Sequence, residues 1–374
     1  MSTDLVATGK QTGTLAERIL AQHLQLMASN VVLGFDAFVD VITRPIAEGS
    51  AGQICRYFET MEEFGRYIVD RSGMNGSVEL AEQSVKLGGN TPNLAHALGR
   101  LGARIHCLAP FGQPEINPVF QPLLQYGELF STGEPGISYA LEFANSKLFL
   151  ALNRSVNQLG WPQIVETLPL ERMRDLTEIA RMICFLNWSE VPGSTSIIRE
   201  LTANILKDLP GTRPFLIDLS DCTRRSTEDL NEILDLIAHL PPSVQPVLSM
   251  NQNEANRVCR ALSISKEIPE KESGLLLLDA LNLHWVVFHN RLRSVLVSRK
   301  GFASYETRMT CEPQLLTGAG DNFNAGLCAG LIMELDPVDC LHLAGLTSGY
   351  YVEHANSASM SELVEYIKDM EAAP

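Results

Sequence analysis

The chain has 374 residues, of which 45% are hydrophobic and 20% are charged. This length and composition fit a folded protein with a substantial core, arranged as one large domain or two smaller ones. The formal net charge of −15 would repel phosphate backbones and anionic lipids, so we expect neither nucleic acid nor a membrane surface as a partner.

The first predicted element is an N-terminal helix. Apolar residues recur at helical spacing over residues 15–28, so we expect a helical extension in residues 1–30, ahead of a main domain in residues 31–374. The sequence shows no secretory signal pattern and no apolar run long enough to cross a bilayer. The eight cysteines are scattered without a C-x-x-C pair, which is typical of reduced thiols. These features predict a cytoplasmic protein.

Short apolar runs alternate with longer helical patterns through most of the chain. The predicted buried strands are residues 31–35, 104–109, 182–187, 214–219, 246–251 and 285–289. The predicted helices between them include residues 93–102, 194–209 and 228–240. This alternation predicts an α/β fold, with a mostly parallel sheet covered by helices on both faces.

Two segments break this alternation. In residues 75–88 and 136–153, apolar and polar residues alternate one by one, which is typical of strands with one exposed face. We expect these strands to form a small accessory sheet that folds over a site as a lid. A single domain with a lid fits better than two independent domains.

The segment 315–327, LLTGAGDNFNAGL, places an acid and two glycines at the start of a predicted helix. The first amides of a helix lack partners inside the helix and carry the positive end of its dipole. We therefore expect Gly318, Ala319 and Gly320 to bind an anion. Asp321 beside them would accept the proton of an attacking hydroxyl in phosphoryl transfer. On this stretch alone, a helix-capping aspartate is an equally good interpretation.

A second polar cluster follows a predicted strand that ends in Gly88 and Gly89. Asn90 and Asn93 stand at the junction between this strand and the next helix, where their amides can donate to and accept from sugar hydroxyls. Taken alone, Asn90 fits a helix cap better than a ligand.

A third cluster lies at the end of the predicted strand 246–251. Asn251 ends this strand and Glu254 follows one turn later, at the edge of the sheet where open α/β folds bind ligands. An amide and a carboxylate at this position suit water-mediated contacts with Mg²⁺ and with phosphate. A solvated helix start is the alternative.

In this order, the three clusters resemble the signatures of the ribokinase-like carbohydrate kinases, the PfkB family. The resemblance covers residues 31–367 and implies a three-layer sandwich with a small β lid. It also implies ATP-dependent phosphorylation of a hydroxymethyl group on a small sugar, with Mg²⁺ bound through water at Glu254. The matching residues are Gly88, Gly89, Asn93 and Ala95 for the sugar, Asn251 and Glu254 for Mg²⁺ and phosphates, and Gly318, Ala319, Gly320 and Asp321 for the anion hole and base.

In this family an aspartate just after the first strand usually holds sugar hydroxyls. The segment GFDAFVDVI offers two candidates, Asp36 and Asp40. Asp40 is the better match because it leads into the chain that rises toward the lid, and Asp36 is the second candidate.

Two segments depart from the family pattern. Leu315 replaces an acid that commonly helps to bind a monovalent cation, so activation by potassium is doubtful. Phe288, His289 and Asn290 replace the small residues of the usual nucleotide loop, which implies a purine site of different shape. His289 and Asn290 are still the candidates for nucleotide contact, although a lone histidine at a strand end is more often structural.

These departures leave two alternatives to a sugar kinase. One is a nucleoside kinase of the same fold, and the other is a regulatory protein that binds a sugar or nucleoside without catalysis. The resemblance also implies that the lid strands can pair with a second copy of the chain to form a homodimer.

Overall fold

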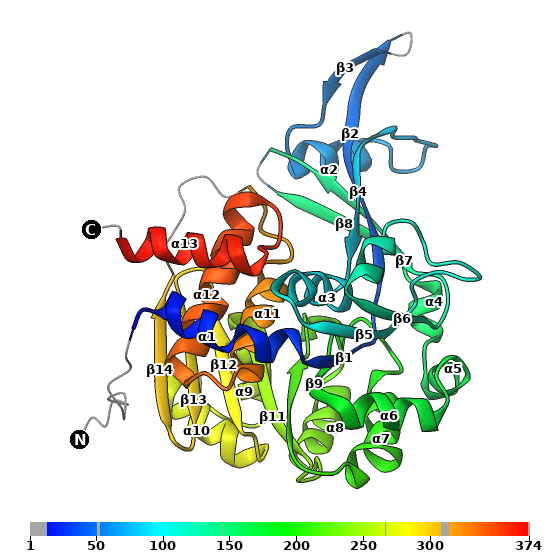
Figure 1. The fold of residues 1–374 in the computed structure, drawn as a ribbon. Helices are drawn as coiled ribbons and strands as arrows, with labels where there is room; N and C mark the ends of the chain where they lie inside the picture. The colour runs from blue at the N-terminus through cyan, green and yellow to red at the C-terminus, as the bar shows by residue number, and fades with distance from the viewer. Residues whose placement is uncertain (1–12, 51–52, 145, 266, 308–313, 373–374) are drawn as a thin grey trace.

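One sheet of nine strands runs through the middle of the molecule (Figure 1). The computed structural model describes residues 13–50, 53–144, 146–265, 267–307 and 314–372. Pairing is parallel from β6 across to β12 and antiparallel from β12 to β14. In spatial order the strands are β14 (Gly301–Glu306), β13 (Arg293–Ser298), β12 (Trp285–His289), β11 (Val244–Asn251), β10 (Arg213–Asp218), β9 (Ala180–Phe185), β1 (Asn30–Gly34), β5 (Arg104–Ala109) and β6 (Gly127–Ser131).

Helices cover both faces of this sheet, so the fold has three layers (Figure 1). One face is covered by α1 (Leu15–Met27), α3 (Asn90–Leu101), α11 (Ala319–Ile332), α12 (Pro337–His354) and α13 (Met360–Ala372). The other is covered by α5 (Trp161–Thr167), α6 (Leu170–Ile179), α7 (Ser194–Asn204), α8 (Thr227–Ala238), α9 (Gln252–Ala261) and α10 (Glu270–Ala280). The predicted α/β fold, with a mostly parallel sheet between two helical layers, is confirmed.

Helix α11 lies deep in this arrangement, packed against α3 and α12. Eleven of its 14 residues are buried, so the helix is covered on nearly every side. Gly326 allows α12 to approach closely, because a Cβ atom there would lie 2.7 Å from the backbone of Ala344. Helix α11 is therefore closely packed between α3 and α12.

A second, smaller sheet stands away from the three layers, at the top of the molecule in Figure 1. Its strands are β3 (Gln53–Tyr57), β2 (Phe38–Ser50), β7 (Gly136–Glu142), β8 (Lys147–Leu152) and, paired with β2, β4 (Leu80–Gly88). Strands β4, β7 and β8 lie within the two segments predicted to form an accessory sheet. Strands β2 and β3 were not predicted, although β2 is the longest strand of this sheet and leads directly from β1.

Helix α2 (Met61–Asp70) covers part of this second sheet. Its Phe64 packs with Phe58, Leu141 and Phe143 in a small core of their own. The second sheet therefore has its own hydrophobic support outside the three-layer body.

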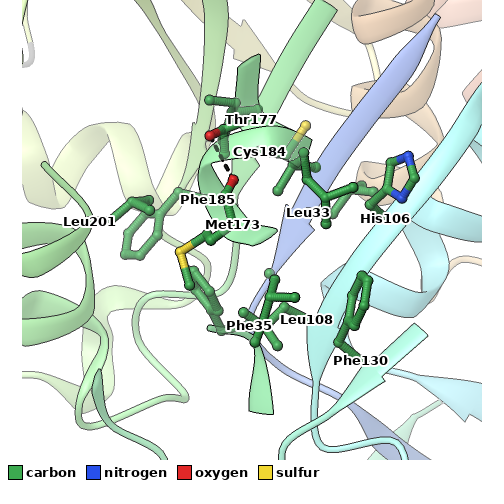
Figure 2. Close-up of a pocket in the computed structure, with 15 residues that line it drawn as sticks. Leu33, Phe35, His106, Leu108, Phe130, Met173, Thr177, Cys184, Phe185 and Leu201 are labelled. Carbon is green, nitrogen blue, oxygen red and sulfur yellow. Dashed lines mark hydrogen bonds between the residues drawn. The ribbon is translucent and has the colours of Figure 1, made fainter. Parts of the chain in front are cut away.

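A small apolar cavity lies within the body, between β1, β9, α6 and α7 (Figure 2). Its volume is about 30 Å³, and Leu33, Met173, Phe185 and Leu201 are among the side chains that line it. The Thr177 hydroxyl at its wall already donates to the Met173 carbonyl at 2.8 Å. Because the lining is almost entirely hydrocarbon, we interpret the cavity as a dry packing defect rather than a ligand site.

None of the helices formed by the described residues combines the length and the apolar character that crossing a membrane requires.

Candidate active site

The starts of three helices meet the carboxyl ends of the parallel strands at one place in the body. The helices are α3, α9 and α11, and each carries one of the motifs identified in the sequence. Four carboxylates gather there with exposed fractions between 0% and 9%: Asp36, Asp218, Glu254 and Asp321. No ion pair joins any of these four to a basic side chain among the described residues. The site therefore gathers buried acidic side chains that have no basic partner among the described residues.

Asp321 lies in the first turn of α11, and Gly318, with φ of 90°, caps that helix. Burial raises the pKa of Asp321 well above its usual value, and the neighbouring carboxylates of Asp218 and Asp36 raise it further. The side-chain amide of Asn93 donates to Asp321 and partly offsets this effect. A carboxylate with raised proton affinity is suited to accept a proton.

The amides beside Asp321 differ in their partners. The Ala319 amide donates to the Leu316 carbonyl at 3.2 Å. Within the part of the chain that the structure describes, no backbone carbonyl accepts from the amides of Gly320 or Asp321. Two donors at the positive end of the α11 dipole are therefore available to an anion, next to the Asp321 carboxylate.

Asp36 is held entirely by the protein. Its carboxylate accepts hydrogen bonds from the amides of Asn90 at 2.8 Å and Thr91 at 3.0 Å, from the Thr91 hydroxyl at 2.8 Å and from the side chain of Asn187 at 2.8 Å. Gly89, with φ of 91°, has no side chain to cap α3, and a Cβ atom there would collide with Asp36. Asp36 therefore serves as the anion that caps the start of α3.

Asp40, on β2, is partly exposed and has fewer partners. Burial raises its pKa to about 6, while a hydrogen bond from Ser138 opposes that shift. The carboxylate lies directly against Gly88, where any side chain would collide with it. Of the two candidate sugar aspartates, Asp40 is the one with hydrogen-bonding capacity left for a ligand.

Asp218 was missed in the sequence analysis. It ends β10 and accepts from the Ser220 amide and the Asn324 side chain, both at 2.8 Å, and from the side chain of Asn90. Burial, together with the charge of Asp36, raises its pKa to about 6. The available signal was its position, because an acid at the carboxyl end of a parallel strand points to a ligand-binding edge.

Glu254 and Asn251 form a reciprocal cap at the start of α9. The Asn251 side chain accepts from the amides of Asn253 and Glu254, and Glu254 accepts from the Asn251 amide at 2.8 Å. Burial raises the pKa of Glu254 to about 8, and the charge of Asp218 contributes to this increase. The described residues contain no group of three or more histidine, cysteine or acidic side chains arranged to hold a metal. A single carboxylate without a cationic partner fits Mg²⁺ held through water rather than in a protein cage.

A pocket of about 560 Å³ opens beside the start of α11, between α9, α12 and the β12–β13 turn. It brings Asn251, His289, Asn290, Ala319 and Gly320 together, and it is large enough for much of a nucleotide.

The side chains of the β12–β13 turn are already engaged in part. The His289 ring stacks on Phe323 with centroids 4.7 Å apart, and burial lowers the pKa of His289 to about 4. Asn290 caps the turn by accepting from the amides of Leu292 and Arg293. Arg291 lines the pocket and is exposed, and it forms no ion pair with the described residues. Sequence reasoning missed Arg291, which is the basic group lining this pocket.

Tyr351, on α12, contacts the segment that leads into α11. Its hydroxyl donates to the Thr317 carbonyl at 2.8 Å, next to Gly318. Burial raises the pKa of Tyr351, and the carboxylates of Asp321 and Asp40 add to this increase. The candidate base and the candidate sugar ligand therefore both act electrostatically on the same hydroxyl.

A three-layer α/β body with a separate small sheet, and with a carboxylate beside free amides at a helix start, defines the class of ribokinase-like kinases, which transfer phosphate to an alcohol group. A family model described as prokaryotic ketohexokinase matches residues 11–370. The chain belongs to that family. Membership favours an enzyme over the non-catalytic regulatory alternative.

Individual relatives agree with this assignment. The chain is 26% identical over 340 residues to a ketohexokinase of Haloferax volcanii, with 89% of each chain covered. Adenosine kinase of Sinorhizobium meliloti has a similar fold, with a TM-score of 0.64, 17% identity, and 93% of this chain and 100% of that chain covered. Arabidopsis thaliana ribokinase, solved with ribose and ATP, gives a TM-score of 0.63 at 15% identity, with 91% and 99% covered.

Proposed function

We propose that the protein transfers the γ-phosphate of ATP to a hydroxymethyl group of a ketohexose, with Asp321 as the general base. The observation that carries this proposal is the buried Asp321 carboxylate, which pairs with no basic side chain of the described residues, beside two amides that have no backbone acceptor in that part of the chain. Family membership and the ketohexokinase relative support a ketohexose as the acceptor.

Asp40 and Asn93 are the proposed sugar-binding side chains. The partly exposed Asp40 carboxylate would accept hydrogen bonds from sugar hydroxyls. The Asn93 amide donates to Asp321 and would orient that carboxylate toward the reacting hydroxyl. Gly88 and Gly89 make no side-chain contact with the sugar in this proposal. Because they lack side chains, they leave room for Asp40 and Asp36 to approach the start of α3. Asn90 supports the site through its bond to Asp218.

ATP would occupy the pocket beside α11, with its γ-phosphate at the amides of Gly320 and Asp321. His289 and Asn290 shape the wall of this pocket, and Arg291 supplies positive charge at its edge. Glu254 would hold Mg²⁺ through water. When bound, the ion neutralises charge on the phosphate oxygens.

The second sheet is the proposed lid. An alkoxide-like oxygen forms readily only where water is excluded, so the sheet that carries Asp40 would cover the sugar during transfer. Because Leu315 stands where an acid commonly helps to bind a monovalent cation, we propose that turnover does not require potassium. Replacing KCl by choline chloride should leave the rate unchanged. We also propose a cytoplasmic location, as the scattered cysteines suggest.

The second sheet is also the proposed surface for homodimer formation. Val85, Leu150 and Leu152 are exposed and share one face of it. Exposed apolar residues on one sheet face are typical of an interaction surface. Light scattering should report a dimer for the native chain and a monomer for Leu152→Asp. A monomeric native chain would contradict this proposal.

The substrate assignment is tested with a panel of acceptors under Mg-ATP. We expect ADP release with a ketohexose such as fructose, and NMR of the product should place the phosphate on a hydroxymethyl oxygen. Preference for adenosine or another nucleoside would instead support the nucleoside kinase alternative. Absence of acceptor-dependent ADP release across the panel would contradict the proposed function.

A further inference from the structure

Helix α12 holds the segment that leads into α11 by four hydrogen bonds. The Val352 carbonyl accepts from the amides of Gln314 at 2.9 Å and Leu315 at 3.3 Å. The Tyr351 hydroxyl donates to the Thr317 carbonyl at 2.8 Å, and the Ser348 hydroxyl donates to the Ala319 carbonyl at 2.9 Å. The segment 314–319 is thus fixed by one helix at points just before the free amides of Gly320 and Asp321.

The Tyr351 contact falls where the backbone conformation matters most. Gly318 has a φ of 90°, in the left-handed region, and a Cβ atom there would lie 2.7 Å from the Tyr351 oxygen. The Thr317 carbonyl belongs to the peptide group that joins Thr317 to Gly318. Holding that carbonyl therefore fixes the peptide plane from which the chain turns into α11.

We propose that Tyr351 is a positioning residue for phosphoryl transfer: its hydroxyl fixes the Thr317 carbonyl and thereby aims the amides of Gly320 and Asp321 at the transferred phosphate. This inference rests on the proposed function. Tyr351 is not a catalytic acid or base, because its proton is already donated to Thr317. Its effect on the reaction passes through the backbone of residues 317–321.

The placement of α12 gives this contact a second consequence. Gly345, Ser348, Gly349 and Val352 of the same helix line the proposed nucleotide pocket. One rigid element therefore forms a wall of the nucleotide site and also positions the donors for the γ-phosphate. Well-aimed donors contribute most where charge develops in the transition state, so loss of Tyr351's hydroxyl should affect transfer more than ground-state binding.

The test compares Tyr351→Phe with Tyr350→Phe. The neighbouring Tyr350 stacks on His354 at 4.0 Å, away from the segment 314–319, so it provides a matched control on the same helix. We expect Tyr351→Phe to lower kcat by about 3- to 10-fold, the effect of one neutral hydrogen bond, with KM for the sugar and affinity for ADP unchanged. Tyr350→Phe should retain the native kcat.

A binding measurement separates positioning from a merely structural role. Aluminium fluoride with ADP and sugar mimics the transferred phosphate, so its affinity should fall in Tyr351→Phe by the same factor as kcat. An unchanged kcat and unchanged aluminium fluoride affinity would overturn the inference, as would a parallel loss of ADP affinity and Tm.

Ser348→Ala keeps the inference testable if Tyr351→Phe fails to fold. It removes a second hydrogen bond from α12 to the same segment, so we expect a fall in aluminium fluoride affinity that is smaller than in Tyr351→Phe but exceeds any fall in ADP affinity. No change in this variant would then count against the inference. The outcome for Asp321→Asn is separate: full turnover in that variant would overturn the proposed function, whereas its inactivity beside a native-like Tyr351→Phe would overturn only the role of Tyr351.

Discussion

Two regions of the molecule bury carboxylates, and they compensate the charge in opposite ways. Where α1 meets α12, the buried Asp339 receives two hydrogen bonds from the Arg18 guanidinium, at 2.5 and 2.7 Å. At the carboxyl ends of the strands, Asp321 and Asp218 are similarly buried, yet no described basic side chain pairs with them. In the first region the carboxylate is neutralised by an arginine of the same chain, whereas in the second the carboxylates have no such partner among the described residues and their pKa values are raised.

This contrast determines how stability should depend on pH. Because folding raises the pKa of Asp321, the folded chain binds more protons than the unfolded chain at a pH between the two values. The stabilising effect of these extra protons is therefore present at low pH and is lost as pH rises through that interval. The carboxylates of the site are a source of instability at neutral pH, as expected of groups retained for chemistry rather than for folding.

The largest expected effect comes from comparing Asp321→Asn with Asp339→Asn. Removing the proton acceptor at position 321 should lower kcat by about 100- to 10,000-fold without lowering the free energy of unfolding. The change at Asp339 should leave turnover per folded molecule intact but reduce the free energy of unfolding by about 1–3 kcal/mol, because it weakens a charged hydrogen-bonded pair. Steady-state kinetics and urea unfolding measure the two quantities.

The reverse outcome would break the comparison. If Asp321→Asn lost stability and kept its kcat, the buried charge at the strand ends would be structural.

Asp40 and Asp36 allow the same comparison within the site, between a carboxylate that is available to a ligand and one that is held by the protein. Asp40→Asn should raise KM for the sugar by about 10-fold or more with little change in stability, since it removes a charged acceptor from the ligand. The native KM should also rise as pH falls below the pKa of Asp40, about 6, because protonation removes the charge, and Asp40→Asn should lose this dependence.

Asp36→Asn is the matched control and should mainly destabilise the protein, because its NH₂ group would replace a carboxylate oxygen that accepts from two of the four donors. An unchanged sugar KM in Asp40→Asn would show that Asp40 does not bind the acceptor.

Replacing Glu254 should have a smaller effect, limited to the dependence of turnover on Mg²⁺. Protons and Mg²⁺ compete for a carboxylate whose pKa is about 8, so the Mg²⁺ concentration for half-maximal turnover should fall as pH rises toward 8. Glu254→Gln should raise that concentration about 10-fold and remove its pH dependence. A native-like Mg²⁺ titration in this variant would exclude Glu254 from the metal site.

The large sheet was predictable because both of its faces are covered. Strands such as β5 and β12 are therefore nearly continuous apolar runs, and the predicted ranges 104–109 and 285–289 match them. Strand β2 lacked this signature, because it crosses from the core into the second sheet and carries Asp40, Arg44 and Pro45 among its apolar residues. Strand β3 is mostly exposed, so its residues show no alternation.

The residues of the site also differ in how well the sequence could predict them. Motif residues that are close in sequence, such as Asn251 with Glu254, could be identified from spacing alone. Asp218 ends β10, Asn187 follows β9 and Tyr351 lies on α12, so only the fold brings these three residues to the motifs. Single polar residues of this kind carry no spacing signal, so sequence patterns could not distinguish them from ordinary strand-end or helix residues.

The smallest effect is expected from filling the apolar cavity (Figure 2), whose lining is almost entirely hydrocarbon. Val32 lines it, and Val32→Ile adds one methylene to a void of about 30 Å³. We expect a gain of about 0.5–1 kcal/mol in the free energy of unfolding and an unchanged kcat. Leu201→Ala, which enlarges the same cavity, should cost about 2–5 kcal/mol. A loss of stability in Val32→Ile would show that the void cannot accept a methylene without strain.

The most direct test is the pH dependence of a single turnover, measured by rapid quench with saturating sugar and Mg-ATP in the native enzyme and in Asp321→Asn. If Asp321 accepts the proton, the native transfer rate will fall on acidification as this carboxylate becomes protonated, and the variant will be slower and independent of pH over that range. A variant that transfers phosphate at the native rate, or that keeps the native pH profile, would contradict the account.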